Sequence, residues 1–136
     1  MMRLIKHLFE TKVLKIFAIL YSLFVTFIML FPLSGNTKVT IPFFDKIVHG
    51  IVYFFFVVIW LLYVTKAYKE IKWAYWIVSL LLFIYGIIIE VLQGNFVANR
   101  TQDTWDIVAN TAGILVGIVV FYKLKRLLFS KTEIPF

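Results

Sequence analysis

The sequence contains no cysteine, and only 15% of its 136 residues are charged. The lack of cysteine excludes disulfide bonds, thiol catalysis and cysteine-ligated metal sites. The shortage of charge argues against an ordinary soluble domain, in which about a quarter of the residues are charged. Apolar residues dominate instead: 62% of the chain is hydrophobic, and the mean hydropathy is +0.95. This composition predicts one small integral membrane domain covering residues 1–136.

The few charged residues are unevenly signed, with 14 Lys and Arg against 7 Asp and Glu. In a soluble protein such an excess would suggest nucleic-acid binding. Here the basic residues flank apolar segments, which is the pattern that orients membrane helices. We therefore expect membrane lipids, and not nucleic acid, to surround this chain.

Four apolar stretches are long enough to cross a bilayer, which requires about 20 mainly apolar residues. They cover about 13–33, 44–64, 73–92 and 107–124, the last with a more polar first turn or two from Asp103. A cleaved signal peptide is the alternative for the first stretch, but its apolar run is long and no small-residue cleavage site follows. Short connections make successive helices antiparallel neighbours. The sequence thus predicts an all-α, four-helix transmembrane bundle.

The distribution of Lys and Arg predicts how this bundle is oriented. Several basic residues lie in the N-terminal segment, in the connection at 65–72 and in the C-terminal tail, whereas the other two connections carry only Lys38 and Arg100. By the positive-inside rule, the N- and C-termini are cytoplasmic, and residues 32–43 and 94–102 face outward. All alternations agree with four spans.

Polar residues interrupt or border the apolar stretches at the end predicted to face outward. They are Asp45, Lys46, His49, Glu90, Gln93, Arg100, Asp103, Asp106 and Asn110. Ionisable groups at membrane depth are costly, so a retained set indicates a functional site. Helical residues three or four apart share a face, as Asp45 and His49 do. We expect this face to point into the bundle, because lipid cannot satisfy polar groups.

Several of these residues also have a purely structural explanation. Asp103 could be a solvated residue favoured near the first turn of a helix. Lys46 could extend its ammonium to the membrane surface. Gly113 and Gly117 continue the polar stripe of the last helix with a spacing that permits close helix packing. Packing is the interpretation we favour for both glycines.

His49 and Glu90 are ambiguous because both lie among apolar neighbours in the sequence. Either could form a buried structural pair, and a histidine beside a carboxylate is also a common general base. Most aromatic residues near the helix ends, Tyr53 among them, are typical of the belts at membrane–water interfaces. Tyr85, in the middle of its helix, could instead form a hydrogen bond inside the bundle.

The same polar residues carry a family resemblance. In order along residues 44–117 stand Asp45-Lys46-x-x-His49, Glu90-x-x-Gln93, Arg100 and Asp106-x-x-x-Asn110-x-x-Gly113-x-x-x-Gly117. On these motifs the chain resembles the VanZ-like family. The resemblance implies a small multi-pass protein of the bacterial cytoplasmic membrane, and links it to a founding member associated with low-level resistance to the glycopeptide teicoplanin.

Two functional hypotheses follow from this constellation. In the first, an outward-facing site binds or modifies an anionic envelope component, such as a lipid phosphate or a lipid-linked cell-wall precursor. Its acid/base candidates are His49, Glu90 and Asp106. Its substrate-binding candidates are Arg100, Lys46, Asp45, Gln93 and Asn110. Arginine suits this role because its planar guanidinium matches phosphate geometry.

In the second hypothesis the protein is not an enzyme: the polar residues fix helix packing, and the protein acts as a membrane scaffold or binds a partner. A transporter has little support from four short spans. The sequence contains no recognisable nucleophile or phosphate-binding loop, and we expect no cofactor. His49, Glu90 and Asp106 suit a metal in ligand type, but one histidine is a weak zinc signal and no metal is assigned.

Overall fold

The computed structural model describes residues 10–31, 43–68, 73–97 and 103–128, with side chains through Lys125. Nearly all of these residues form four helices: α2 (Thr11–Leu30), α3 (Phe44–Tyr68), α4 (Trp73–Phe96) and α5 (Thr104–Leu128). Each helix is long and apolar enough to cross a membrane. The all-α, four-span prediction is therefore confirmed, and the chain is a multi-pass membrane protein.

The helix ends differ from the predicted spans. α2 ends at Leu30, three residues early, whereas α3, α4 and α5 each continue four residues past the predicted end. The start of α5 at Thr104 agrees with the polar first turns predicted from Asp103, and Asp106 lies within the helix. The first N–H groups of a helix lack intrahelical partners. The carboxylate of Asp103 accepts one of them, from Trp105 at 2.9 Å, which explains why the helix begins here.

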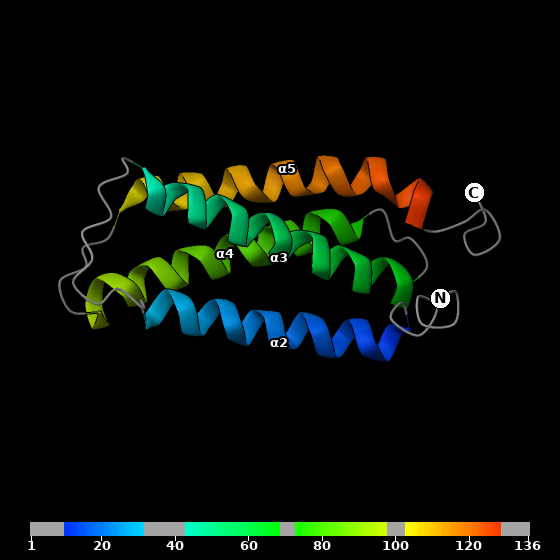
Figure 1. Ribbon diagram of the computed structural model, residues 1–136, viewed down its shortest axis with the longest axis horizontal. Helices are drawn as coiled ribbons and strands as arrows, with labels where there is room; N and C mark the ends of the chain where they lie inside the picture. The colour runs from blue at the N-terminus through cyan, green and yellow to red at the C-terminus, as the bar shows by residue number, and fades with distance from the viewer. Residues whose placement is uncertain (1–9, 32–42, 69–72, 98–102, 129–136) are drawn as a thin grey trace.

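The four helices lie side by side in one bundle (Figure 1). α3 is central and contacts each of the other three, while α4 also contacts α2 and α5. The first turn of α2 and the last turn of α5 lie at the same end of the bundle, as an even number of antiparallel spans requires. The side of the membrane that this end faces stays a prediction.

The crossing of α3 and α5 depends on two glycines of α5. A Cβ atom at Gly113 would overlap the carbonyl oxygen of Gly50 on α3. One at Gly117 would overlap the side chain of Val57 and lie 2.9 Å from the carbonyl oxygen of Phe54. Membrane helices associate largely through such packing, because lipid provides little hydrophobic drive between them. The predicted packing role of Gly113 and Gly117 is confirmed.

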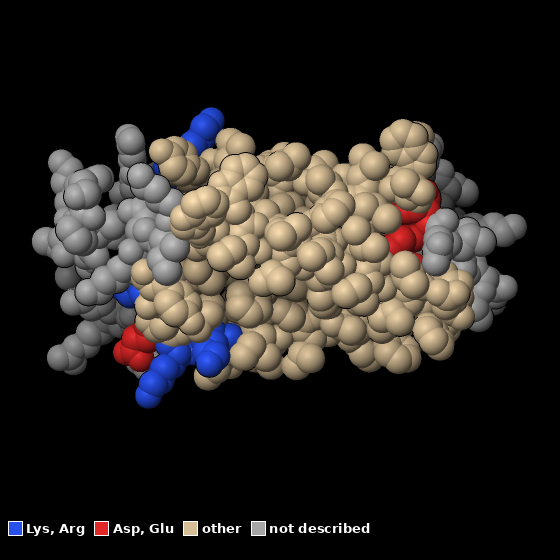
Figure 2. All heavy atoms as spheres, turned by 180° about the vertical axis from the view of Figure 1, so that it is seen from behind, with Lys and Arg blue, Asp and Glu red and all other residues tan. Residues whose placement is uncertain are grey.

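Apolar side chains fill the centre of the bundle and also cover its outside. Tyr53, Phe56 and Leu61 of α3 pack with Phe121 of α5 in the buried core. Large apolar side chains are also exposed on all four helices, and the middle of the face seen in Figure 2 carries no charge. A broad apolar surface of this kind marks contact with a membrane.

Candidate functional site

The start of α3, the end of α4 and the start of α5 meet at one end of the bundle (Figure 1). Polar side chains from these three segments form what we term the polar cluster. It comprises Asp45, Lys46 and His49 of α3, Glu90 of α4, and Asp103, Asp106 and Asn110 at the start of α5. The structure thus brings together most of the candidates proposed from the sequence.

Lys46 connects α3 to α5 through two carboxylates. Its ammonium forms an ion pair with Asp103 and lies 3.0 Å from Oδ1 of Asp106. The Lys46 side chain is 26% exposed, whereas that of Asp106 is 2% exposed. Lys46 is therefore directed across the helix interface and not out along the membrane surface. The nearby ammonium, together with the N–H of Trp105, lowers the pKa of the Asp103 carboxyl below its ordinary value.

His49 is buried between α3 and α5, and its two ring nitrogens have different surroundings. Nδ1 lies 3.1 Å from the amide oxygen of Asn110. Because that oxygen can only accept, Nδ1 is the protonated nitrogen in this arrangement. Nε2 lies 3.8 Å from a carboxylate oxygen of both Asp45 and Asp106. These distances are too long for hydrogen bonds.

Glu90 joins the end of α4 to the start of α5. Its side chain is buried, and Oε1 accepts the backbone N–H of Asp103 at 2.6 Å. Asp103 therefore contacts Lys46 through its carboxylate and Glu90 through its backbone. These contacts connect all three helices of the polar cluster through one residue.

Two of the predicted site residues are not placed in the polar cluster. Gln93 is fully buried and donates from Nε2 to the carbonyl oxygen of Met29 on α2, at 2.8 Å. That carbonyl lies in the last turn of α2, where intrahelical partners are missing, so Gln93 satisfies a helix end. Arg100 lies outside the described residues, and its predicted contact with an anion stays a prediction.

Tyr53 is the residue that sequence reasoning misplaced. It is fully buried, and its hydroxyl makes no hydrogen bond with the rest of the described chain. A Cβ atom at Gly86 would lie 3.3 Å from that hydroxyl and 3.4 Å from the amide nitrogen of Asn110, so both groups line the same small space. The interfacial-belt interpretation of Tyr53 is wrong, because Gly86 leaves room for the ring inside the bundle. Its position four residues after His49, on the same helix face, was the available signal.

Carboxylates outnumber cations among the described residues of the polar cluster. Acidic atoms lie recessed at this end of the molecule, between uncharged residues (Figure 2). One ligand atom from each of Asp45, His49 and Asp106 can be chosen so that all lie within 4.8 Å of one another. Mixed carboxylate and imidazole ligands can hold a divalent cation, but the ammonium of Lys46 already contacts Asp106. Because carboxylates predominate, an anion can bind this cluster only through a cation.

The fold and the polar cluster define a class: a small multi-pass membrane protein with ionisable side chains buried at one end of a four-helix bundle. The family model described as VanZ/LLP1 matches residues 7–129, nearly the whole chain. The chain therefore belongs to the VanZ/LLP1 family, and the resemblance drawn from the polar motifs is confirmed. Neither the curated proteins nor the solved structures include a match to this sequence.

Proposed function

We propose that the polar cluster binds an anionic component of the bacterial envelope at the outer face of the cytoplasmic membrane, and exchanges a proton with it. One observation carries this proposal: three ionisable side chains, His49, Glu90 and Asp106, are gathered from three helices and are at most 3% exposed. Well-packed apolar residues would often stabilise such an interior as well or better. Retaining titratable groups at this depth therefore favours a chemical role.

The ligand would enter beside Asp45, Lys46 and Asp103, the partly exposed members of the polar cluster. A phosphate would exchange places with the Asp103 carboxylate at the Lys46 ammonium, while Arg100 would supply a second cation. Because the surrounding carboxylates repel an anion, these two cations decide whether it binds. A lipid phosphate or a lipid-linked cell-wall precursor fits best, since both present a phosphate at the membrane surface.

His49 is the proposed acid/base group. Nε2 would take a proton from a ligand hydroxyl or from water, and Asp45 and Asp106 would stabilise the resulting imidazolium. The Asn110 amide would hold the ring in the orientation that exposes Nε2 to the ligand. Glu90 would hold the backbone of Asp103, and so keep the start of α5 in place while the phosphate replaces the Asp103 carboxylate.

The contacts themselves favour a second candidate function, a non-enzymatic scaffold. Lys46 with Asp106, and His49 with Asn110, each join α3 to α5, and Glu90 joins α4 to the segment before α5. A network of this kind can fix the register of the helices. In that case the protein would act through a membrane partner, and the titratable groups would be inert.

A pair of substitutions at His49 separates the two functions. The amide nitrogen of asparagine takes the place of Nδ1, so His49→Asn retains a donor to Asn110 and removes Nε2. Glutamine places its amide nitrogen near Nε2 instead. Each variant would be compared with the parent for membrane accumulation, melting temperature in detergent and the teicoplanin susceptibility of its host.

For a proton-transfer site, His49→Asn should accumulate and melt like the parent and yet lose the phenotype. For a scaffold, His49→Asn should retain the phenotype, because the contact between helices survives. Asn95→Ala is the matched control, since Asn95 lies at the same end of the bundle but is exposed and bonds only within α4 in the described chain. A well-folded His49→Asn variant with full activity would refute the proposed proton transfer.

A further inference from the structure

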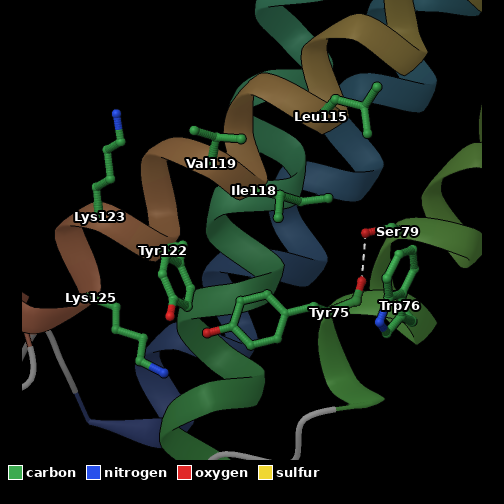
Figure 3. A pocket seen from close by; sticks show the side chains of 9 residues that line it. All are labelled: Tyr75, Trp76, Ser79, Leu115, Ile118, Val119, Tyr122, Lys123 and Lys125. Carbon is green, nitrogen blue, oxygen red and sulfur yellow. Dashed lines mark hydrogen bonds between the residues drawn. The ribbon is translucent and has the colours of Figure 1, made fainter.

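A groove lies between α4 and α5 at the end of the bundle opposite the polar cluster. It encloses about 680 Å³, between the first turns of α4 and the last turns of α5. Leu115, Ile118 and Val119 of α5 form its apolar wall, and Tyr75 and Trp76 of α4 stand opposite (Figure 3). Neither the polar cluster nor its proposed function involves this groove.

The groove extends along part of one leaflet of a bilayer. Its lining on α5 extends from Leu115 to Lys125, which is about 15 Å at 1.5 Å per residue. The apolar wall, from Leu115 to Val119, takes up about 6 Å of this length, and each leaflet contributes about 15 Å of hydrocarbon. The apolar wall therefore offers a surface for part of one acyl chain of a single leaflet.

One cation of the groove points into its end. Lys123 and Lys125 both lie beyond the apolar wall, nearest the end of α5, but the ammonium of Lys125 points toward Tyr75, whereas that of Lys123 points away from it (Figure 3). The ammonium of Lys125 lies 5.9 Å from the ring centre of Tyr75 and 5.7 Å from that of Tyr122. Tyrosine and tryptophan are enriched at the depth of lipid headgroups. This end therefore has both the charge and the side chains of a headgroup site.

We propose that the groove binds one anionic phospholipid, with an acyl chain along Leu115 and Ile118 and the phosphate against Lys125, while Lys123 adds to the positive charge at the same depth. Basic pockets between membrane helices recognise anionic headgroups in this way. The charge argues for an anionic lipid over a zwitterionic one, whose own cation would meet Lys125. It also argues against a partner helix, which would cover the apolar wall without requiring cations beyond it.

The test is native mass spectrometry of the purified full-length protein, titrated with phosphatidylglycerol or with phosphatidylcholine of the same acyl chains. The parent should retain one phosphatidylglycerol at a several-fold lower lipid concentration than phosphatidylcholine. The double variant Lys123→Gln, Lys125→Gln should weaken phosphatidylglycerol binding about tenfold, since each basic residue near the surface adds to the attraction. The control is Lys12→Gln, Lys15→Gln, which changes the charge equally on exposed residues of α2, at the same end of the bundle.

A second pair of variants tests the apolar wall. Val119→Trp should fill the groove and weaken the binding of both lipids, whereas Val116→Trp should not. Val119 and Val116 are similarly exposed on α5, at 54% and 55%, but only Val119 lines the groove. Any one of three results would overturn the proposal. The α2 control could lose as much phosphatidylglycerol binding as the double variant, the parent could retain both lipids equally, or the two tryptophan variants could bind lipid alike. Those results would mean that lipid merely surrounds the helices.

Discussion

α5 meets its two neighbours in contrasting ways. Toward α3 it presents Gly113 and Gly117, so the two backbones come into contact. Toward α4, in the part of α5 nearer its C-terminal end, α5 presents Leu115 and Val119, and a groove lies between the two helices. The close crossing brings the polar side chains of α3 and α5 at its end into contact with one another, as with His49 and Asn110. The open side leaves space for a lipid.

Gly113→Ala should cause the largest loss of stability. It should also remove the close contact with α3 that distinguishes this side of α5 from the side facing α4. The new methyl group would meet the backbone of Gly50, which cannot move aside as a side chain can. We expect a loss of about 3 kcal/mol or more, at the upper end for overpacking. The measurement is membrane accumulation together with melting in detergent.

Gly50→Ala is the matched control for Gly113→Ala, because it adds the same methyl group to the other side of the same crossing. Its nearest contact would be the carbonyl oxygen of Ala109 at 3.5 Å, an ordinary van der Waals distance. We expect little change in stability. If both variants melt alike, the crossing is not as close as described.

Lys46→Gln should have the next largest effect, within the polar cluster. The substitution leaves the buried carboxylate of Asp106 without its neighbouring ammonium. We expect a loss of about 2 kcal/mol, in the range for a buried charged group that loses a partner. Denaturation in detergent measures it. The double variant Lys46→Gln, Asp106→Asn should recover part of this loss, and failure to recover any would show that the pair does not act as a unit.

Gly117→Ala should be milder than Gly113→Ala, because part of its clash is with a side chain. The overlap with Val57 can be relieved, although the carbonyl oxygen of Phe54 would still lie 2.9 Å away. We expect a loss of about 1–2 kcal/mol. A cycle with Val57→Ala should give a favourable coupling of about 0.5 kcal/mol or more. Strict additivity would contradict contact between these two residues.

Asp103 should contribute the smallest of these effects, a dependence of the protein's stability on pH. Its pKa in the folded protein lies below the ordinary value of 3.8, chiefly because of Lys46. A lowered folded-state pKa adds stability above the ordinary value, and this stability disappears as the pH falls through the lowered pKa. The difference in melting temperature between the parent and Asp103→Asn should therefore be largest near neutral pH and shrink below pH 3.8. A difference that grows on acidification would contradict the ion pair.

Much of the architecture was predictable because it depends on local patterns. The length of an apolar stretch predicts a span, and spacings of three and four place Asp106, Asn110 and Gly113 on one face. All three are buried in the structure. Helix ends were less predictable, since they depend on groups that satisfy the terminal backbone, as Asp103 does for α5. The loop that carries Arg100 lies outside the described residues.

Other features depended on how the helices are rotated and which neighbour each one meets. Gln93 shares a face with Glu90, yet it bonds to α2 while Glu90 bonds to the segment before α5. Nothing in the spacing of the two residues distinguishes these partners. Tyr53 looked like an interfacial aromatic, and only the position of Gly86 on α4 shows why its ring is buried.

The sequence by itself determined the membrane class, the four helices, the polar stripe and the family, because hydrophobic length and helical periodicity are properties of consecutive residues. The tertiary structure decided the rest. It brought Asp103 and Asp106 to Lys46 across the interface between α3 and α5, gave the two ring nitrogens of His49 different neighbours, and opened the groove between α4 and α5. The physical reason is that contacts between helices depend on how closely the helices cross and on how each helix is rotated. The crossing distance and the rotation are defined only once the small side chains of two helices meet.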